Sequence, residues 1–149
     1  MDTSVVGIDK ERTITNMNDW NSQLIKEFRA NGGKVGGQFE GAPLLLLTTT
    51  GAKSGQRRTT PVMYLPDGNR LVIFATKGGA PTNPAWYHNL LAHPQATVEV
   101  GTETFDVKAV VITGEERDRL YARQAKLYSG FADYEARTTR QIPVIALER

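Results

Sequence analysis

The segment Pro43–Thr50 constrains the fold of this chain more than any other. It contains four consecutive leucines followed by three β-branched threonines, a composition typical of a buried β-strand. The apolar run is far too short to cross a membrane. The basic, glycine-containing segment Gly51–Arg58 follows directly, and Thr59–Leu65 again has the composition of a strand. The sequence therefore predicts two strands joined by a basic turn.

The rest of the chain predicts further strands and a few helices. Apolar residues in Asn16–Ala30 recur at three- and four-residue steps, which indicates an amphipathic helix. Further strands are expected at 70–76, 96–100, 102–112 and 142–147, and further helices at 83–91, 113–127 and 131–138. Asn83 is expected to cap the first of these helices, and Thr113 with Glu116 has the spacing of a capping box.

The order of these elements indicates a fold class. Strands and helices do not alternate regularly, which argues against a doubly wound parallel sheet. We expect an α+β fold of about six mainly antiparallel strands, with an N-terminal helix and two or three further packed helices. Six such strands could close into a small barrel.

Length and composition limit the function. At 149 residues the chain fits one domain, which we expect to span 16–149 behind a flexible arm at 1–15. The net charge of +2 gives no overall attraction to nucleic acid. The lack of cysteine excludes disulfides and thiolate metal sites, and the two histidines have no partners at ligand spacing, so no metal site is expected. The N-terminus does not have the pattern of a secretion signal, so a cytoplasmic protein is expected.

The predicted helix over 16–30 has two interpretations. Its apolar residues can cover the core, which we favour. Trp20 and Phe28, flanked by Lys26 and Arg29, would also suit weak contact with a membrane surface. Such contact would place the protein peripherally at the inner face of the cell membrane.

Two basic loops at strand ends suggest an anion site. Lys53, Arg57 and Arg58 lie within six residues, beside glycines that let backbone N–H groups approach a ligand. Arginine binds phosphate or carboxylate bidentately, and lysine acts as a point charge. The segment Thr76–Gly79 has the same character at another strand end. Cations on solvated turns are the alternative, and the glycine spacing of a P-loop or a Rossmann dinucleotide site is missing.

Aromatic residues form two further groups. A helix over Asn83–Asn89 would pack Trp86 and leave Tyr87 or Asn89 free to face a ligand. Tyr128, Phe131 and Tyr134 recur at three-residue spacing. They could form a core stripe or, because Ser129-Gly130 interrupts the helix beside them, a mobile aromatic lid.

Three motifs in order carry a family resemblance. They are LTTTGxKSGxxR at 47–58, TKGG at 76–79 and NPxWYxNL at 83–90. With them, roughly residues 36–148 resemble the deazaflavin-dependent nitroreductase family of actinobacteria, whose members use coenzyme F420. The resemblance implies a split β-barrel related to that of FMN-binding oxidases.

The resemblance also implies where the cofactor binds. The expected cofactor-binding residues are Ala52, Lys53, Ser54, Arg58, Thr59, Thr60, Pro61, Val62, Met63, Phe74, Ala75, Thr76, Lys77, Ala85, Trp86, Tyr87, His88 and Asn89. Coenzyme F420 carries a phosphate and a polyglutamate tail, which gives the Lys and Arg cluster a physical purpose. Ala52 stands where some relatives carry a basic residue, which would loosen the grip on the tail.

The implied reaction is hydride transfer from the reduced cofactor, F420H2, to a small electron-poor acceptor. The acceptors of the family include quinones, nitroaromatics and α,β-unsaturated lactones or coumarins. Tyr128, Phe131 and Tyr134 correspond to its substrate wall, with Tyr128 and Tyr134 as the catalytic candidates. The proton could come from a tyrosine hydroxyl or from water. Because Phe131 replaces a tyrosine of the nitro-drug-activating member, we expect a quinone or enone reductase.

Two other readings of the basic loops stay open. The protein could bind or store F420, or a related flavin such as FMN, without catalysing a reaction. Nucleic-acid binding is the least favoured, because no row of exposed aromatic residues accompanies the charges. We expect a monomer or a weak homodimer.

Overall fold

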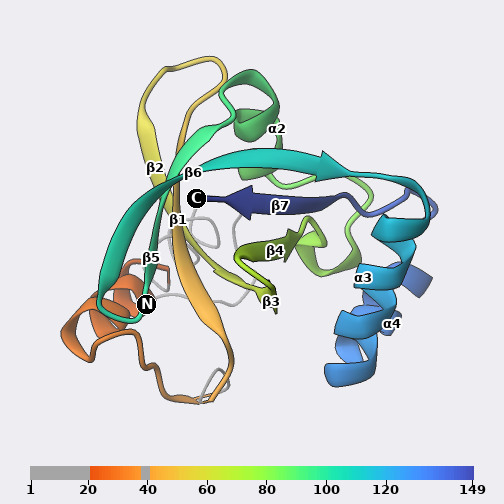
Figure 1. Ribbon diagram of the computed structural model, residues 1–149, viewed down its shortest axis with the longest axis horizontal. Helices are drawn as coiled ribbons and strands as arrows, with labels where there is room; N and C mark the ends of the chain where they lie inside the picture. Colours follow the sequence, from red (N-terminus) through yellow and green to blue (C-terminus); the bar gives the residue numbers. More distant parts are fainter. Residues whose placement is uncertain (1–20, 38–40) are drawn as a thin grey trace, which may run out of the picture.

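The computed structural model describes residues 21–37 and 41–149 (Figure 1). The arm expected at 1–15 lies outside the described residues, as do residues 16–20 of the expected N-terminal helix. Residues 21–30 are helical, so the predicted helix is confirmed over that part. No helix within the described ranges is long and apolar enough to cross a membrane.

In the described part of the chain, one antiparallel sheet of seven strands forms the body of the protein. Its strands, in chain order, are β1 (Leu44–Thr50), β2 (Arg57–Met63), β3 (Leu65–Asp67), β4 (Arg70–Phe74), β5 (Gln95–Val100), β6 (Glu103–Ile112) and β7 (Val144–Glu148). Their order across the sheet is β2-β1-β5-β6-β7-β4-β3. Figure 1 shows the sheet strongly curled, so that β4 returns toward β1 and β2. The expected α+β class and antiparallel pairing are confirmed.

One 3₁₀ turn and three helices follow β1 along the described chain. They are the 3₁₀ turn η2 (Lys77–Gly79) and the helices α2 (Ala85–Ala92), α3 (Gly114–Leu127) and α4 (Gly130–Ala136). In Figure 1, α2 lies beside the turn that joins β1 to β2, and α3 and α4 lie together at the opposite end of the sheet.

The leucine run of β1 is continuous because both of its faces are buried. Leu45 and Leu47 belong to a core cluster under α2, together with Ile73 and Trp86. The alternate leucines, Leu44 and Leu46, pack instead against Leu24 and Phe28 of the N-terminal helix. Because strand side chains alternate between faces, a strand covered on both sides needs no polar position. The core-covering interpretation of Phe28 is therefore correct.

A second core cluster lies under α3 and α4. Residues of β4 and β7 that face away from α2, such as Val72 and Val144, pack there against Leu120, Tyr121 and Phe131. The sheet thus has helices on both faces, and α4 reaches the core through Phe131, which is 7% exposed.

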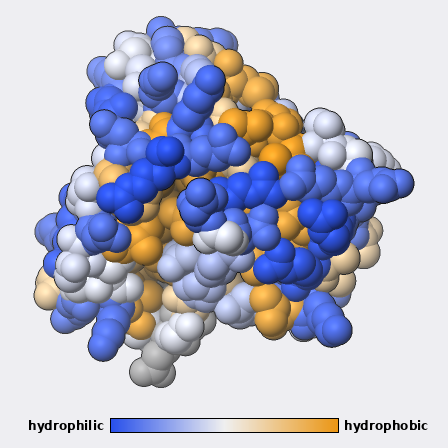
Figure 2. Space-filling model, in the orientation of Figure 1, coloured by the Kyte–Doolittle hydropathy of each residue, from blue (hydrophilic) through white to orange (hydrophobic). Residues whose placement is uncertain are grey.

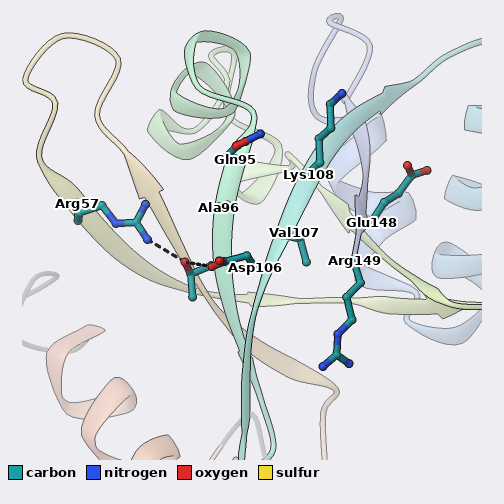
Figure 3. A pocket seen from close by; sticks show the side chains of 9 residues that line it. Arg57, Gln95, Ala96, Asp106, Val107, Lys108, Glu148 and Arg149 are labelled. Carbon is teal, nitrogen blue, oxygen red and sulfur yellow. Dashed lines mark hydrogen bonds between the residues drawn. The ribbon is translucent and has the colours of Figure 1, made fainter.

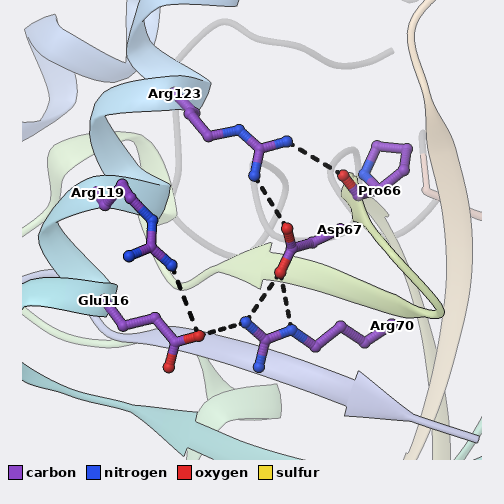
Figure 4. Close-up of polar contacts among 6 residues, drawn as sticks. All are labelled: Pro66, Asp67, Arg70, Glu116, Arg119 and Arg123. Carbon is purple, nitrogen blue, oxygen red and sulfur yellow. Dashed lines mark hydrogen bonds and ion pairs between the residues drawn. The ribbon is translucent and has the colours of Figure 1, made fainter.

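Charged residues tie α3 to the β3–β4 hairpin. Arg70 pairs with Glu116 and, 2.8 Å away, with Asp67, which also accepts a hydrogen bond from Arg123 (Figure 4). The hydrogen bonds from Arg70 and Arg123 lower the pKa of Asp67 below its ordinary value. Figure 2 shows mostly hydrophilic residues on this view of the molecule, with apolar residues in smaller patches between them.

Three local predictions were wrong. The strand expected over 59–65 is interrupted at Tyr64, so β3 is a separate strand and the sheet has seven strands instead of about six. Asn83 does not cap α2, whose N-cap is Pro84. Thr113 is the N-cap of α3 but makes no side-chain capping bond, and the Glu116 side chain pairs with Arg70 instead of completing a capping box.

Candidate functional site

A large cavity lies between the β1–β2 turn, the start of α2 and the N-terminal helix. Its volume is about 1050 Å³. We call it the basic pocket, and its lining residues are Asn21, Ser22, Ile25, Thr49, Gly51, Ala52, Lys53, Ser54, Arg57, Arg58, Thr59, Thr60, Ala85, Trp86, His88 and Asn89. The turn and α2 were both expected at this site. Asn21, Ser22 and Ile25 of the N-terminal helix were not expected there, because nothing in their spacing distinguishes them from residues of an ordinary amphipathic helix.

The conformation of the β1–β2 turn depends on its two glycines. The Gly51 N–H donates to the Gln56 carbonyl at 2.8 Å, and the Gly55 N–H donates to the Gly51 carbonyl at 3.0 Å. Gly55 has a φ of +72°, which disfavours any residue with a Cβ. A Cβ added to Gly51 would lie 2.4 Å from the Ser54 hydroxyl oxygen. The chain therefore forms a tight turn that keeps Ser54 against its own backbone.

Asn89 fastens this turn to α2. Its Nδ2 donates to the Thr49 hydroxyl at 3.1 Å, and its Oδ1 accepts from the Ala52 N–H at 3.0 Å. Both ends of the amide are therefore used by the protein. Asn89, one of the expected cofactor residues, lines the basic pocket, and its amide supports the conformation of the turn.

Three cations surround the mouth of the basic pocket. Lys53, Arg57 and Arg58 are exposed, and within the described ranges none of them forms an ion pair with a carboxylate. Arg58 donates to the Gln56 side chain at 3.1 Å. The positive charge of the turn is thus directed to solvent and to the cavity, which is the arrangement that attracts an anion.

Arg57 separates the basic pocket from a second cavity on the sheet. It donates to the hydroxyls of Thr50 at 3.3 Å and Thr97 at 2.9 Å, and Thr97 donates to Asp106. The second cavity, of about 580 Å³, is lined by Arg57, Gln95, Ala96, Thr97, Asp106, Val107, Lys108, Glu148 and Arg149 (Figure 3). Its acidic and basic side chains alternate, so it lacks the consistent positive charge of the basic pocket.

A smaller pocket adjoins the basic pocket. Its volume is about 230 Å³. We call it the aromatic pocket, and its lining residues are Thr60, Pro61, Val62, Met63, Phe74, Thr76, Lys77, Pro84, Trp86, Phe131 and Tyr134. Thr60 and Trp86 line both pockets, so the two cavities are adjacent. Segments that are up to 74 residues apart in sequence meet here.

The aromatic wall of this pocket is held in place by its neighbours. Phe131 makes edge contacts with Phe74 and Tyr134, at ring-centre distances of 5.7 and 5.4 Å. The Tyr121 hydroxyl donates to the Phe131 carbonyl at 2.6 Å, and burial raises the pKa of Tyr121 to about 12. Tyr128 packs against Phe131 from outside the pocket. These contacts favour the core-stripe reading over a mobile lid.

Most predicted site residues line one of these two pockets. The basic pocket contains Ala52, Lys53, Ser54, Arg58, Thr59, Thr60, Ala85, Trp86, His88 and Asn89, and the aromatic pocket contains Thr60, Pro61, Val62, Met63, Phe74, Thr76, Lys77, Trp86, Phe131 and Tyr134. Three line neither pocket. Ala75 is fully buried, Tyr87 packs on the core under α2, and Tyr128 packs on α4. Among the described residues, no group of three His, Cys, Asp or Glu side chains could hold a metal ion.

Comparisons with known proteins agree with this geometry. The model of the F420H2-dependent quinone reductase family matches residues 20–149. An F420H2-dependent quinone reductase of Mycobacterium tuberculosis is 41% identical over 128 residues, which cover 82% of this chain and 85% of the relative. A solved F420H2-dependent reductase is 38% identical, with a TM-score of 0.65 over 71% of this chain and 94% of that one. A further solved structure, described as a domain-swapped dimer, is 34% identical with a TM-score of 0.68 over 91% and 99%.

These matches confirm two expectations from the sequence. The three motifs did indicate a family that uses deazaflavin. The curled antiparallel sheet with packed helices is the split β-barrel that the resemblance implied.

Proposed function

Because the chain belongs to the F420H2-dependent quinone reductase family, we propose that it binds reduced coenzyme F420 and reduces small quinones. The cofactor, when bound, supplies the hydride. The observation that carries the proposal is the junction of the two pockets at Thr60 and Trp86. A cofactor with an anionic tail and a flat ring needs a cationic cavity next to an aromatic one.

The basic pocket suits the phosphate and the polyglutamate tail. Lys53 and Arg58 supply positive charge without a carboxylate partner among the described residues. Arginine can bind carboxylate or phosphate through two parallel hydrogen bonds. Arg57, which was not among the expected cofactor residues, lines the same pocket and is held by Thr50 and Thr97. We add it to the tail site.

The aromatic pocket suits the ring system and the acceptor. Trp86, Phe74 and Phe131 line it with apolar rings, and a bound ring system that displaced water there would strengthen the electrostatic interactions inside. Tyr134 is the one tyrosine among the described residues that line the aromatic pocket, so we propose it as the group that donates a hydrogen bond or a proton to the reduced acceptor. Tyr128, the other catalytic candidate, is placed to support Phe131.

We also propose an order of preference among the acceptors. Quinones come first, because the relatives carry that activity in their names. α,β-Unsaturated lactones or coumarins, and nitroaromatics, are further candidate acceptors that share an electron-poor carbon or nitrogen. We expect nitroaromatics to be the weakest of these, because Phe131 has no hydroxyl to contact a nitro group.

Turnover with a simple quinone tests the proposal. Purified protein is mixed with reduced F420 and menadione, and reoxidation of the deazaflavin is followed by its absorbance. We expect rapid reoxidation that needs the protein, and slower reoxidation with Tyr134→Phe. No turnover with quinone, enone or nitro acceptors would refute the reductase, and tight F420 binding without turnover would instead indicate a storage protein. Tighter binding of FMN than of F420 would refute the choice of cofactor.

The expectations on partners and location stay predictions. We propose a cytoplasmic monomer or weak homodimer, and analytical ultracentrifugation over a range of concentrations tests the oligomeric state. Membrane contact by the N-terminal helix would have to proceed without Phe28, which is 1% exposed. Cosedimentation with anionic lipid vesicles tests that contact.

A further inference from the structure

We propose that Arg140 is a positioning residue of the aromatic pocket: its guanidinium holds the loop 75–83 in the conformation that brings Lys77 into the lining of the pocket, together with Tyr134. This inference rests on the proposed function for its effect on cofactor binding. Arg140 lies between α4 and β7 and lines neither pocket. No sequence motif singled it out.

The guanidinium of Arg140 binds three segments of the loop at once. Its Nε donates to the Ala80 carbonyl at 2.9 Å, and its Nη2 donates to the Thr76 carbonyl at 2.8 Å. Its Nη1 donates to the Ala75 carbonyl at 3.2 Å and to the Asn83 side chain at 2.7 Å. The loop is therefore fixed where it leaves β4, in its middle and where it enters α2.

The loop needs such a clamp because its backbone is unusual. Lys77 has a φ of +47°, and among the described residues it is the only non-glycine residue with a positive φ. A side-chain-bearing residue persists in this conformation only where its surroundings hold it. The carbonyls that Arg140 binds lie on both sides of Lys77. The Lys77 ammonium itself donates to the Thr82 hydroxyl at 3.2 Å, so its direction also depends on the loop.

The same loop packs directly on α4, the helix that carries Phe131 and Tyr134 of the aromatic pocket. Gly79 has a φ of +83°, and a Cβ added there would lie 2.9 Å from the Tyr134 carbonyl oxygen and 3.0 Å from the Arg137 Cβ. The loop thus packs directly on the backbone of α4. By holding the loop around Gly79, Arg140 keeps the segment that carries Lys77 packed against the backbone of Tyr134.

Lysine cannot replace Arg140 in this role. The four acceptors are reached from three different nitrogens of a planar group, whereas a lysine has one nitrogen with three protons. Arg140→Lys therefore keeps the charge and loses the geometry. Arg123→Lys is the matched control, because Arg123 also donates to a backbone carbonyl, that of Pro66, and lines neither pocket.

Hydrogen exchange on the cofactor-free protein tests the clamp itself. The amides of Gly79 and Ala80 donate to carbonyls within the loop, and the amide of Thr76 donates to the Phe74 carbonyl at the end of β4. We expect Arg140→Lys to speed their exchange by about tenfold or more, since clamp and loop open together, while Arg123→Lys leaves them unchanged. Equal exchange in the wild type and in Arg140→Lys would overturn the inference, whatever the protein binds.

Titration with F420 tests the consequence for the site. We expect Arg140→Lys to weaken F420 binding by about tenfold, as a misplaced binding group does, without changing the salt dependence of the affinity. In a protein that already carries Lys77→Ala, Arg140→Lys should reduce the affinity for F420 much less, because the two residues act through one loop. Full additivity, or a smaller salt dependence in Arg140→Lys, would overturn the positioning role. If the wild type does not bind F420, the proposed function and the expected effect on binding are both overturned. The hydrogen-exchange result would still show whether Arg140 holds the loop.

Discussion

Replacement of Asn89 separates the geometry of the basic turn from its charge. The Asn89 amide makes two hydrogen bonds, at 3.1 Å to Thr49 and 3.0 Å from the Ala52 N–H. Asn89→Ala removes both. At about 1 kcal/mol for each net hydrogen bond, we expect a loss of about 1–3 kcal/mol in the free energy of unfolding. For a chain of this size that corresponds to a decrease in Tm of about 3–10 °C.

Asn89→Asp is the matched variant. Its carboxylate can still accept from the Ala52 N–H, and the Thr49 hydroxyl can turn to donate to it. We therefore expect a much smaller loss of stability, measured by urea unfolding at pH 7. The added negative charge lies in the basic pocket, so F420 binding should weaken, and the loss should shrink as salt is added.

Each of the two variants has an outcome that would contradict this reasoning. If Asn89→Ala unfolds at the same urea concentration as the wild type, the amide does not hold the turn. If Asn89→Asp binds F420 as tightly as the wild type at low salt, the basic pocket does not hold the anionic tail. Isothermal titration at two salt concentrations measures the second outcome.

Three more predictions follow from individual contacts. Gly79→Ala places a Cβ 2.9 Å from the Tyr134 carbonyl, so thermal unfolding should show a loss of about 1–3 kcal/mol, and an unchanged Tm would contradict the close packing. Tyr121→Phe removes the hydrogen bond to Phe131 and should lower the free energy of unfolding by about 1 kcal/mol in urea at pH 7. Because the pKa of Tyr121 is raised to about 12, the stabilisation by its hydroxyl should be present below pH 10 and lost as the pH rises through 12. Asp67 has a lowered pKa, so its charge stabilises the fold above about pH 4, and that stabilisation is lost as the pH falls further. Asp67→Asn should therefore lower the Tm at pH 7, and an equal decrease of the Tm at pH 2 would contradict a stabilising role of the charge.

Local patterns predicted the elements well because local burial decides them. The leucine run of β1 gave a strand, and both of its faces proved to be covered. The break at 129–130 correctly separated two helices. Leu65 was assigned to the wrong strand because nothing in the local composition shows where a strand bends at Tyr64.

Long-range polar contacts could not be predicted from spacing. Asn83 and Glu116 looked like capping residues, but each is used by a distant arginine, Arg140 and Arg70 respectively. The same limit applies to the site. The motifs placed Lys53 and Lys77 at strand ends, whereas the adjacency of their pockets depends on how the sheet curls.

The most direct test of the two adjacent pockets compares F420 with the same deazaflavin lacking the phosphate and tail. Both are titrated into the wild type and into Lys53→Ala with Arg58→Ala, at low and high salt. We expect F420 to bind the wild type far more tightly than the truncated compound, and the double variant to lose most of that advantage while binding the truncated compound unchanged. Equal affinities of the two compounds for the wild type, or an advantage of F420 that survives the double variant, would contradict a tail site in the basic pocket.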